Sequence, residues 1–329
     1  MRKTLAKIAY LLLALAILPG EALAQAARKT PRVAYVWLFD AGPSAPYADP
    51  FKARLAELGW KHGQTLQFET YDAKSDPARL AAIMDELVRT KVDVIVAMCT
   101  PEAKAALKAT STIPIVVTSA GDLVAAGLVT NLARPGANLT GFSVLTREMG
   151  FKRLELLSQW FPKVRRATVI WNPARPENAV EVADMQAAAK RLGIELRSQQ
   201  IRTPLELATV LEMLPVDGTQ AILNAGDPVI SGNAAAVARR AAELAIPGLY
   251  TERIFPAQGG LMSYGADMNV QQRRAAEYVD RILKGEKPGE MPIEQAQRFE
   301  FVINRKVARD QGWNIPQSVL LRADEMIDR

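Results

Sequence analysis

The chain has 329 residues, of which 49% are hydrophobic and 23% charged, and its formal net charge is +6. This composition is typical of a globular protein and excludes a disordered one. Basic and acidic residues are interspersed without a long basic block, so we expect no nucleic-acid partner. The single cysteine, Cys99, excludes an internal disulfide, so stability has to come from burial of a core.

The first 24 residues have the pattern of an export signal. Three basic residues within the first seven precede an apolar run from Ile8 to Leu18, and Ala22-Leu23-Ala24 matches a small-x-small cleavage site. The apolar run is shorter than the ~20 residues that span a bilayer. We therefore predict a signal peptide over residues 1–24, cleavage after Ala24, a periplasmic location and no membrane insertion after cleavage. Without this segment the net charge is +4.

Strands and helices are expected to alternate along the first half of the remaining chain. The helix over residues 77–89 is the clearest, because Asp76 is a capping residue, Pro77 suits the first helical position, and apolar residues recur at positions 80, 83, 84 and 87. The predicted strands are continuously apolar, which favours a parallel sheet covered on both faces. In chain order we expect strands over 33–38, 66–71, 92–98 and 115–118, and helices over 50–58, 77–89 and 101–110.

The second half of the chain repeats the first at a nearly constant offset. Arg32–Trp37 (RVAYVW) recurs as RATVIW from Arg166, 134 residues later. Two shorter matches, Leu-Gly at 58 and 192 and Ile-Pro at 113 and 246, have offsets of 134 and 133 residues. The repeat predicts two doubly wound, Rossmann-like α/β lobes with a ligand cleft between them. The second lobe is expected to contain strands over 168–171, 195–201, 221–223 and 248–250, and helices over 177–192, 205–214 and 234–244.

Three segments rich in Gly, Pro or small polar residues are predicted to be hinge crossings between the lobes: 138–147, 255–260 and 287–292. After the second, a helix with an apolar stripe ends at Gly285 and is expected to return to the first lobe. Residues 298–303 and the terminal segment then close the second lobe. Lobe 1 is accordingly predicted over 30–143 plus 258–289, and lobe 2 over 144–257 plus 290–329.

Candidate ligand-binding residues follow from the topology. In open α/β sheets the ligand crevice lies beyond the carboxyl ends of the strands, and helix N-termini point into it. Cys99 and Glu252 occupy such loops. The residues that we expect to contact ligand are Asp40, Ser44 and Tyr47 after the first strand, Thr100 after the third, Ser119 and Asp122 after the fourth, and Asn172, Asn224, Asp227 and Tyr250 on the facing lobe.

The chemistry of these residues suits a small zwitterion. Thr100 precedes Pro101 at a helix start, where free N–H groups bind a carboxylate. Asp122 or Asp227 is a possible acceptor for an ammonium group, and tyrosine rings offer flat walls for an apolar ligand. Each residue also has an ordinary structural interpretation, as a helix cap, a turn residue or part of the core, and the sequence leaves both open.

The sequence lacks the catalytic residues that most enzyme classes require. His62 is the only histidine and lies in a predicted turn away from the crevice, which argues against a Ser-His-Asp or Cys-His device. One histidine and one cysteine cannot build the usual zinc sites, and no G-x-G-x-x-G or Walker loop follows a strand. We therefore expect no catalytic residues, no metal and no cofactor. A pair of carboxylates remains open, because their pairing in space is not visible in a sequence.

Several motifs resemble one known family. They are residues 121–141 (GDLVAAGLVTNLARPGANLTG), 152–157 (KRLELL), 259–265 (GGLMSYG), 281–285 (RILKG), 299–304 (FEFVIN) and 322–325 (RADE). In this order they are similar to the substrate-binding proteins of ABC transporters in the family that includes tryptophan and other aromatic amino-acid binders. The resemblance implies a type I periplasmic-binding-protein fold, with two α/β lobes, three crossings, ligand in the cleft and delivery to a membrane permease.

The chain departs from that family at three places. Leu123 follows Asp122 where Asp-Pro is frequent, Ala137 follows Gly136 where Gly-Gly is frequent, and Phe39-Asp40 ends the first strand where small residues are usual. These differences bear on the ligand and leave the fold expectation intact.

The prediction is a monomeric periplasmic solute-binding component of an ABC importer, with a permease and its ATPase as partners. It is expected to bind a small ligand in the interlobe cleft by hinge closure, with an amino acid, and an aromatic one first, as the leading candidate. Two alternatives stay open: a ligand-sensing partner of a membrane receptor, which uses the same fold, and an exported hydrolase that uses two carboxylates.

Overall fold

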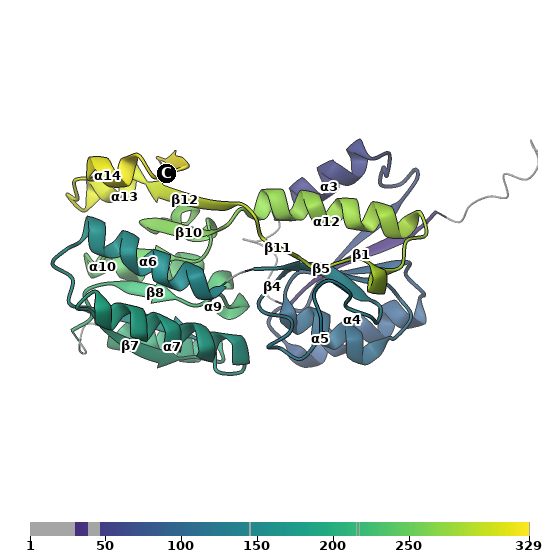
Figure 1. The fold of residues 1–329 in the computed structure, drawn as a ribbon, viewed down its shortest axis with the longest axis horizontal. Helices are drawn as coiled ribbons and strands as arrows, with labels where there is room; N and C mark the ends of the chain where they lie inside the picture. The colour runs from purple at the N-terminus through teal and green to yellow at the C-terminus, as the bar shows by residue number, and fades with distance from the viewer. Residues whose placement is uncertain (1–29, 39–46, 145, 215, 217, 329) are drawn as a thin grey trace, which may run out of the picture.

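The computed structural model describes residues 30–38, 47–144, 146–214, 216 and 218–328. The predicted signal peptide and two of the predicted site residues, Asp40 and Ser44, lie outside the described residues. Two α/β lobes lie side by side along the long axis of the molecule (Figure 1), which confirms the predicted fold class.

Lobe 1 is built on a six-stranded sheet in the order β11-β5-β4-β3-β1-β2, and all its strand pairs are parallel. The strands are β1 (Arg32–Trp37), β2 (Gln67–Asp72), β3 (Val94–Ala97), β4 (Ile115–Ala120), β5 (Leu139–Ser143) and β11 (Glu294–Gln295). The helices are α3 (Ala48–Glu57), α4 (Pro77–Arg89), α5 (Thr100–Ala109) and the late helix α12 (Met268–Leu283), which lies beside α3 (Figure 1).

Lobe 2 is built on a seven-stranded sheet in the order β13-β12-β10-β9-β8-β6-β7, in which only the β10–β12 pair is antiparallel among the described strands. The strands are β6 (Arg166–Trp171), β7 (Glu195–Gln200), β8 (Ile222–Asn224), β9 (Gly248–Tyr250), β10 (Met262–Ala266), β12 (Phe299–Asn304) and β13 (Glu325–Ile327). The helices are α6 (Thr146–Trp160), α7 (Pro176–Arg191), α8 (Pro204–Met213), α9 (Pro228–Gly232), α10 (Ala234–Glu243), α11 (Ile254–Ala257), α13 (Arg305–Asp310) and α14 (Gln317–Leu320).

The 134-residue repeat corresponds to a repeat of topology. β1 lies between β2 and β3 in the first sheet, and β6 lies between β7 and β8 in the second, with parallel pairing in both cases. The predicted helix over residues 77–89 is confirmed as α4. The Asp76 carboxylate caps it by accepting a hydrogen bond from Ala78 N at 2.8 Å, and its apolar stripe is buried. Aliphatic residues of β1 are fully buried, as continuous apolar strands predict.

Two of the three crossings lie elsewhere than predicted. Residues 255–260 belong to α11 and its following turn within lobe 2, because the Phe255 ring stacks on Tyr250 with ring centroids 4.4 Å apart. β10 is then paired into the second sheet, and the chain crosses at Asp267. The assignment of 258–289 wholly to lobe 1 is therefore wrong for β10.

The third crossing is also displaced. Residues 287–292 include a 3₁₀ turn (η2, Pro288–Glu290) held against lobe 1, where Gly136 N donates to Gly289 O at 3.2 Å. β11 then pairs with β5, so the chain crosses over residues 296–298 and lobe 2 begins again at β12, later than the predicted residue 290. Gly and Pro mark turns inside a lobe as readily as hinges between lobes, which explains both errors.

The three crossing segments contact one another. Ala296 N donates to Ser143 O at 3.0 Å, and Asp267 N donates to Arg298 O at 3.0 Å. The Asp267 carboxylate also pairs with Arg298 Nε at 3.3 Å. Neighbouring crossings that share hydrogen bonds are expected to bend together, because a large change in one would break its bonds to the next.

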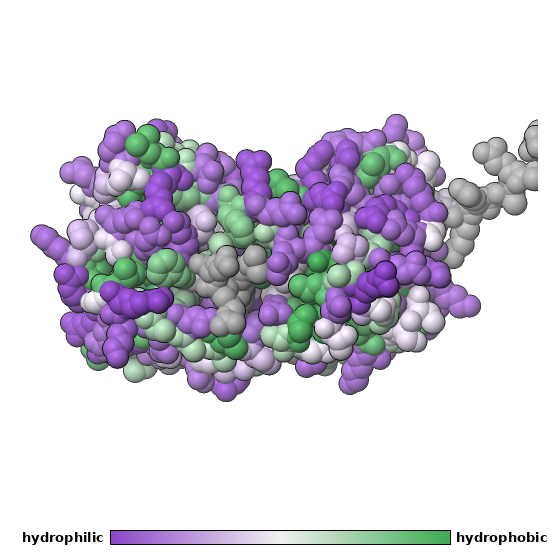
Figure 2. All heavy atoms as spheres, viewed as in Figure 1, coloured by the Kyte–Doolittle hydropathy of each residue, from purple (hydrophilic) through white to green (hydrophobic). Residues whose placement is uncertain are grey.

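The surface is mostly hydrophilic on the face drawn in Figure 2, with small separated apolar patches. Within the described ranges, no helix combines the length and apolarity needed to cross a membrane.

Candidate functional site

A cavity lies between the two lobes and is lined by the strand ends of both. In lobe 1 the lining follows β3, β4 and β5, and in lobe 2 it follows β6, β8 and β9 and includes the adjoining ends of β10 and β12. This is where the topology places the crevice of an open α/β sheet. The apolar part of the wall includes Met98, Val144, Met149, Met268 and Phe299.

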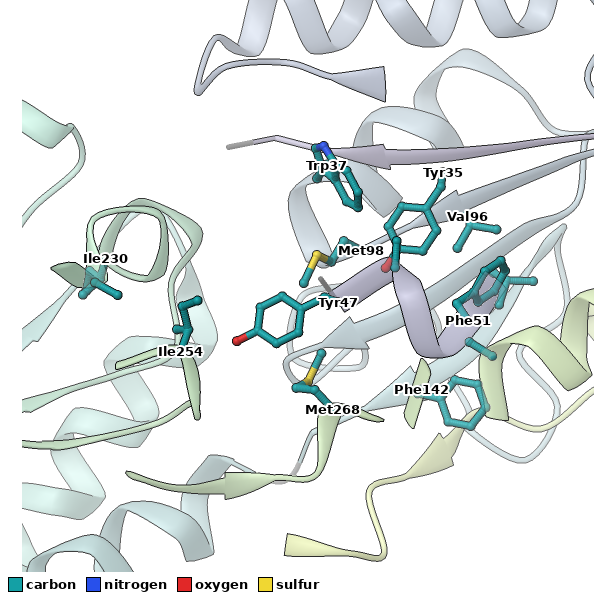
Figure 3. Packing of buried hydrophobic residues seen from close by; sticks show 14 of the residues in the cluster. Tyr35, Trp37, Tyr47, Phe51, Val96, Met98, Phe142, Ile230, Ile254 and Met268 are labelled. Carbon is teal, nitrogen blue, oxygen red and sulfur yellow. The ribbon is translucent and has the colours of Figure 1, made fainter. Parts of the chain in front are cut away.

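An apolar contact joins the lobes beside this cavity. The Tyr47 ring, at the start of α3, lies between Met98 and Met268 of lobe 1 and Ile254 of lobe 2 (Figure 3). Its hydroxyl is 3.5 Å from Glu252 Oε2 on the facing lobe. Burial raises the pKa of Tyr47 well above its usual value, and the Glu252 charge adds to this, so the phenol stays protonated and can donate.

Arg175 provides the positive charge of the cavity. It precedes α7 in the loop after β6 and is 9% exposed. Its Nε and Nη2 donate to Glu177 Oε1 at 3.0 and 2.9 Å, and Nη2 also donates to Thr100 Oγ1 of lobe 1 at 3.3 Å. Burial alone would lower the pKa of Arg175, but nearby carboxylates, Glu177 first, outweigh it and the pKa is raised. The guanidinium therefore stays charged.

Two carboxylates face Arg175 in the same cavity. Asp227 Oδ1 accepts hydrogen bonds from Val229 N at 2.8 Å and Ile230 N at 3.3 Å, which caps α9. Glu252 Oε1 accepts a hydrogen bond from Ser231 Oγ at 2.6 Å. Burial raises the pKa of both acids, and Arg175 offsets part of this. The Asp227 charge raises the pKa of Glu252 further, so a cation held between the two acids would stabilise both.

A second ion pair lies in lobe 2, and its arginine, Arg153, lines the cavity. Arg153 Nη2, on α6, donates to Glu181 Oε1 on α7, and Arg153 Nη1 donates to the Tyr264 carbonyl oxygen at 3.4 Å. Arg153 is 2% exposed and Glu181 is fully buried. Three atoms of this region have no hydrogen-bond partner among the described residues: Arg153 Nε, Glu177 Oε2 and Glu181 Oε2.

The structure brings some of the predicted site residues to the cavity. Ser119 and Asp227 line it, and Thr100 lies against it through its bond to Arg175. The Thr100 hydroxyl also accepts a hydrogen bond from Gly121 N at 3.2 Å. Thr100 is the first residue of α5, whereas the residue at the capping position is Cys99, which itself lines the cavity. Tyr47 lies at the edge, in the apolar contact described above.

Four other predicted residues have structural contacts and do not line the cavity. Asp122 is exposed and accepts bonds from Val124 N and Ala125 N in its own loop. Asn172 accepts a bond from Ala174 N, and Asn224 bonds Thr251 Oγ1 and Thr251 N between strand ends. The Tyr250 side chain is buried in the core against Phe255.

Sequence reasoning missed Arg175, Glu177 and Arg153. The prediction considered only the residue that follows each strand, which after β6 is Asn172, three residues before Arg175. Arg175-Pro176 nevertheless marks the start of the following helix. Arg153 and Glu177 lie inside helices, where a charged residue is usually on the solvent face, so no local pattern indicates them. Glu252 does lie in a strand-end loop, and the same reasoning reaches it.

The described residues contain no group of three or more metal-ligating side chains. His62 lies in an exposed turn, where its Nδ1 accepts a hydrogen bond from Phe68 N at 3.1 Å. The chemistry of the cavity is therefore that of buried charges, hydroxyl groups and an apolar wall.

Solved structures match this fold over nearly the whole chain. A conserved domain protein from Vibrio cholerae is 27% identical, with a TM-score of 0.84 over 91% of this chain and 100% of that one. An ABC domain from Streptococcus pneumoniae in complex with L-Trp is 23% identical with a TM-score of 0.83 over the same shares. A ligand-free, open substrate-binding protein with adhesive properties from Clostridium difficile is 25% identical, and its TM-score over the same shares is 0.65.

The bond from Arg175 to Thr100 joins the two lobes across the cavity.

Sequence comparisons identify the family. A protein described as a tyrosine-binding protein from Clostridioides difficile is 30% identical over 255 residues, which are 77% of this chain and 73% of that protein. The family model for ABC transporter substrate binding proteins matches residues 45–327. The chain therefore belongs to the family of ABC transporter substrate-binding proteins.

Proposed function

We propose that this chain is the periplasmic solute-binding component of an ABC importer, and that it binds an aromatic amino acid between its lobes. The observation that carries the proposal is the composition of the interlobe cavity. Beside an apolar wall rich in methionine, it holds the buried guanidinium of Arg175 and, facing it, the carboxylates of Asp227 and Glu252. An aromatic amino acid has one group for each of these.

The carboxylate of the ligand would bind Arg175. The guanidinium uses Nε and Nη2 for its bonds to Glu177 and Thr100, which leaves Nη1 for the ligand. Ser119 adds a hydroxyl group to the same cavity. Charge-assisted hydrogen bonds of this kind are roughly twice as strong as neutral ones.

The ammonium group would lie between Asp227 and Glu252. Burial raises the pKa of both acids, and the Asp227 charge adds to this at Glu252; the charge of a cation at this place would offset these effects. The aromatic ring would then pack against Met98, Met149 and Met268, since thioether–aromatic contacts are favourable.

The comparisons support the same ligand class. One relative is described as binding tyrosine, and one structure of the same fold contains L-Trp. We further propose a monomer that is exported by the segment over residues 1–24, performs no catalysis itself, and delivers its ligand to a permease with an ATPase.

Binding to purified protein tests the proposal directly. Tyrosine, tryptophan and phenylalanine, with sugars and nucleosides as controls, are added in a thermal-shift screen and then titrated by calorimetry. A ligand at 100 times its Kd should stabilise the fold by about 2.7 kcal/mol. Failure of every aromatic amino acid to shift the melting temperature at millimolar concentration would refute the ligand class. Reduced uptake of the ligand by cells that lack this gene is the result expected for an importer.

A further inference from the structure

One part of the cavity contains more polar groups than the ends of a zwitterion require. Arg153 and Glu177 both line the cavity, and they are 2% and 4% exposed. Arg153 Nε is a donor without a partner, and Glu177 Oε2 is an acceptor without a partner, among the described residues. A buried donor and a buried acceptor are both costly when unpaired, so their presence in the wall of a binding cavity points to the ligand as the partner of both.

The two residues come from neighbouring helices. Glu177 and Glu181 are one turn apart on α7 and therefore share a face. Arg153 belongs to α6, which packs against α7, and bonds Glu181 directly. The Glu177 charge acts on Glu181, which places Arg153, Glu177 and Glu181 in one cluster.

This cluster is separate from the acids proposed for the ammonium group. Arg175 is bonded to Glu177, and its charge acts on Glu181, Asp227 and Glu252, so it is common to both groups of acids. A ligand whose carboxylate is bound at Arg175 has the ammonium group on the side of Asp227 and Glu252. Arg153 and Glu177 line the same cavity and are therefore within the space open to its side chain.

We propose that Arg153 and Glu177 form a subsite for a phenolic hydroxyl group, so that the chain binds tyrosine more tightly than phenylalanine. The hydroxyl donates a hydrogen bond to Glu177 Oε2 and accepts one from Arg153 Nε. An indole N–H has only a donor and satisfies Glu177 alone, and a phenyl ring satisfies neither atom. The expected order of affinity is therefore tyrosine, tryptophan, phenylalanine. This inference rests on the proposed function, because it assumes an aromatic amino acid in the cavity.

The size of the preference follows from the cost of unpaired groups. A site built to hydrogen-bond a hydroxyl group rejects the analogue without it far more strongly than an apolar site does. A hydrogen bond to a charged group corresponds to about tenfold to a hundredfold in affinity. We expect tyrosine to bind at least about tenfold more tightly than phenylalanine.

The competing explanation is that these charges only fasten α6 to α7. The Arg153–Glu181 pair would do this alone, without an unpartnered Glu177 oxygen in the cavity wall. Under that explanation, changes at Arg153 or Glu177 alter the affinity for tyrosine and phenylalanine by the same factor.

Calorimetric titration of the purified chain with tyrosine, tryptophan and phenylalanine separates the two. Glu177→Gln keeps a carbonyl oxygen for Arg175 and replaces the free acceptor by an amide N–H₂. It should lower the affinity for tyrosine about tenfold or more and change that for phenylalanine by less than about twofold. Arg153→Lys retains a charge for Glu181 but lacks Nε, and should also reduce the tyrosine preference. Glu195→Gln, at an exposed carboxylate on β7, is the matched control and should change neither affinity.

The outcomes distinguish the subsite from the proposed function. Equal affinity of the unaltered chain for tyrosine and phenylalanine would overturn the subsite and leave the aromatic amino-acid assignment standing. An equal loss of affinity for tyrosine and phenylalanine in Glu177→Gln would also overturn the subsite, because it would show that Glu177 acts only through Arg175. Failure of all three amino acids to bind would overturn the ligand class and the subsite together. If Arg153→Lys does not fold, as judged by its circular-dichroism melt, Glu177→Gln decides the question.

Discussion

Glu300, on β12 next to the hinge, is an acid whose pKa is raised by burial. Its side chain is 11% exposed, and Arg253 Nη1 lies 3.5 Å from its Oε2. Burial and then the Asp267 charge raise the pKa of Glu300 to about 7, although Arg253 opposes them. The folded state therefore binds this proton more tightly than the unfolded state, in which the pKa is about 4.3. The stabilisation from this bound proton is fully present below about pH 4.3 and is lost as the pH rises through about 7.

Glu300→Gln should remove this pH dependence. The variant and the unaltered chain should melt at similar temperatures near pH 4.5, where both side chains are neutral, and the variant should be the more stable near pH 8. Melting curves between these limits measure the difference. A difference that does not change with pH would contradict the raised pKa, and Glu195→Gln, at an exposed acid, should show none.

At the scale of secondary-structure elements, strand β5 depends on Gly141. Its φ of +133° is unfavourable for other residues, and a Cβ there would lie 2.0 Å from the Val117 carbonyl oxygen on β4. Since that oxygen belongs to the backbone of the paired strand, it cannot move without breaking the β4–β5 ladder. Gly141→Ala should therefore lower the free energy of unfolding by about 2–4 kcal/mol.

Gly136→Ala is the matched control for this change. Gly136 has φ of +83°, but no atom lies within 4 Å of the position of an added Cβ. Its replacement should cost only about 1 kcal/mol, the penalty of the backbone conformation. Urea unfolding of both variants measures the two losses, and equal losses would show that the close approach to Val117 does not matter.

At the scale of the whole molecule, hydrogen bonds join the lobes across the cavity. The bond from Arg175 to Thr100 Oγ1 is one, and Cys99 lines the cavity beside it. Cys99 is partly exposed, but desolvation of its thiol and the nearby Glu102 charge raise its pKa, so it reacts slowly in this arrangement. Because Cys99 is the only cysteine, its rate of alkylation reports how often the lobes open.

We expect a saturating aromatic amino acid to slow alkylation of Cys99 by at least about tenfold, since ligand favours the closed arrangement. Thr100→Val, which removes the cross-lobe acceptor, should speed alkylation of the free protein. A rate that neither ligand nor Thr100→Val alters would show that the thiol is accessible without lobe opening. A sugar that does not bind serves as the control, and scattering measurements of the radius of gyration give an independent measure of closure.

Much of the fold could be predicted from the sequence because its signals are local. The cap at Asp76 and the apolar stripe of α4 lie within one helix, and continuous apolar strands indicate a covered parallel sheet. The repeat at 134 residues then predicted two lobes of one topology. The crossings were less predictable: turn residues at 255–260 and 287–292 have the same composition whether the turn closes a lobe or leaves it.

The candidate site shows the same division. Strand order alone places Ser119 and Asp227 at the crevice, because the carboxyl ends of parallel strands meet at one edge. Tyr250 satisfied that argument too, yet its ring packs into the core, since position along a strand end does not decide which way a side chain points.

The sequence alone was sufficient for the two-lobed α/β fold and for the edge of each sheet that faces the cleft, because periodicity and strand order are properties of short segments. Only the tertiary structure could show that Arg175 meets Thr100 across the cleft, or that Arg153 and Glu177 lie in the cavity wall with unpartnered atoms. Such contacts join residues far apart in the chain, and their burial and charge depend on how two lobes and two packed helices come together.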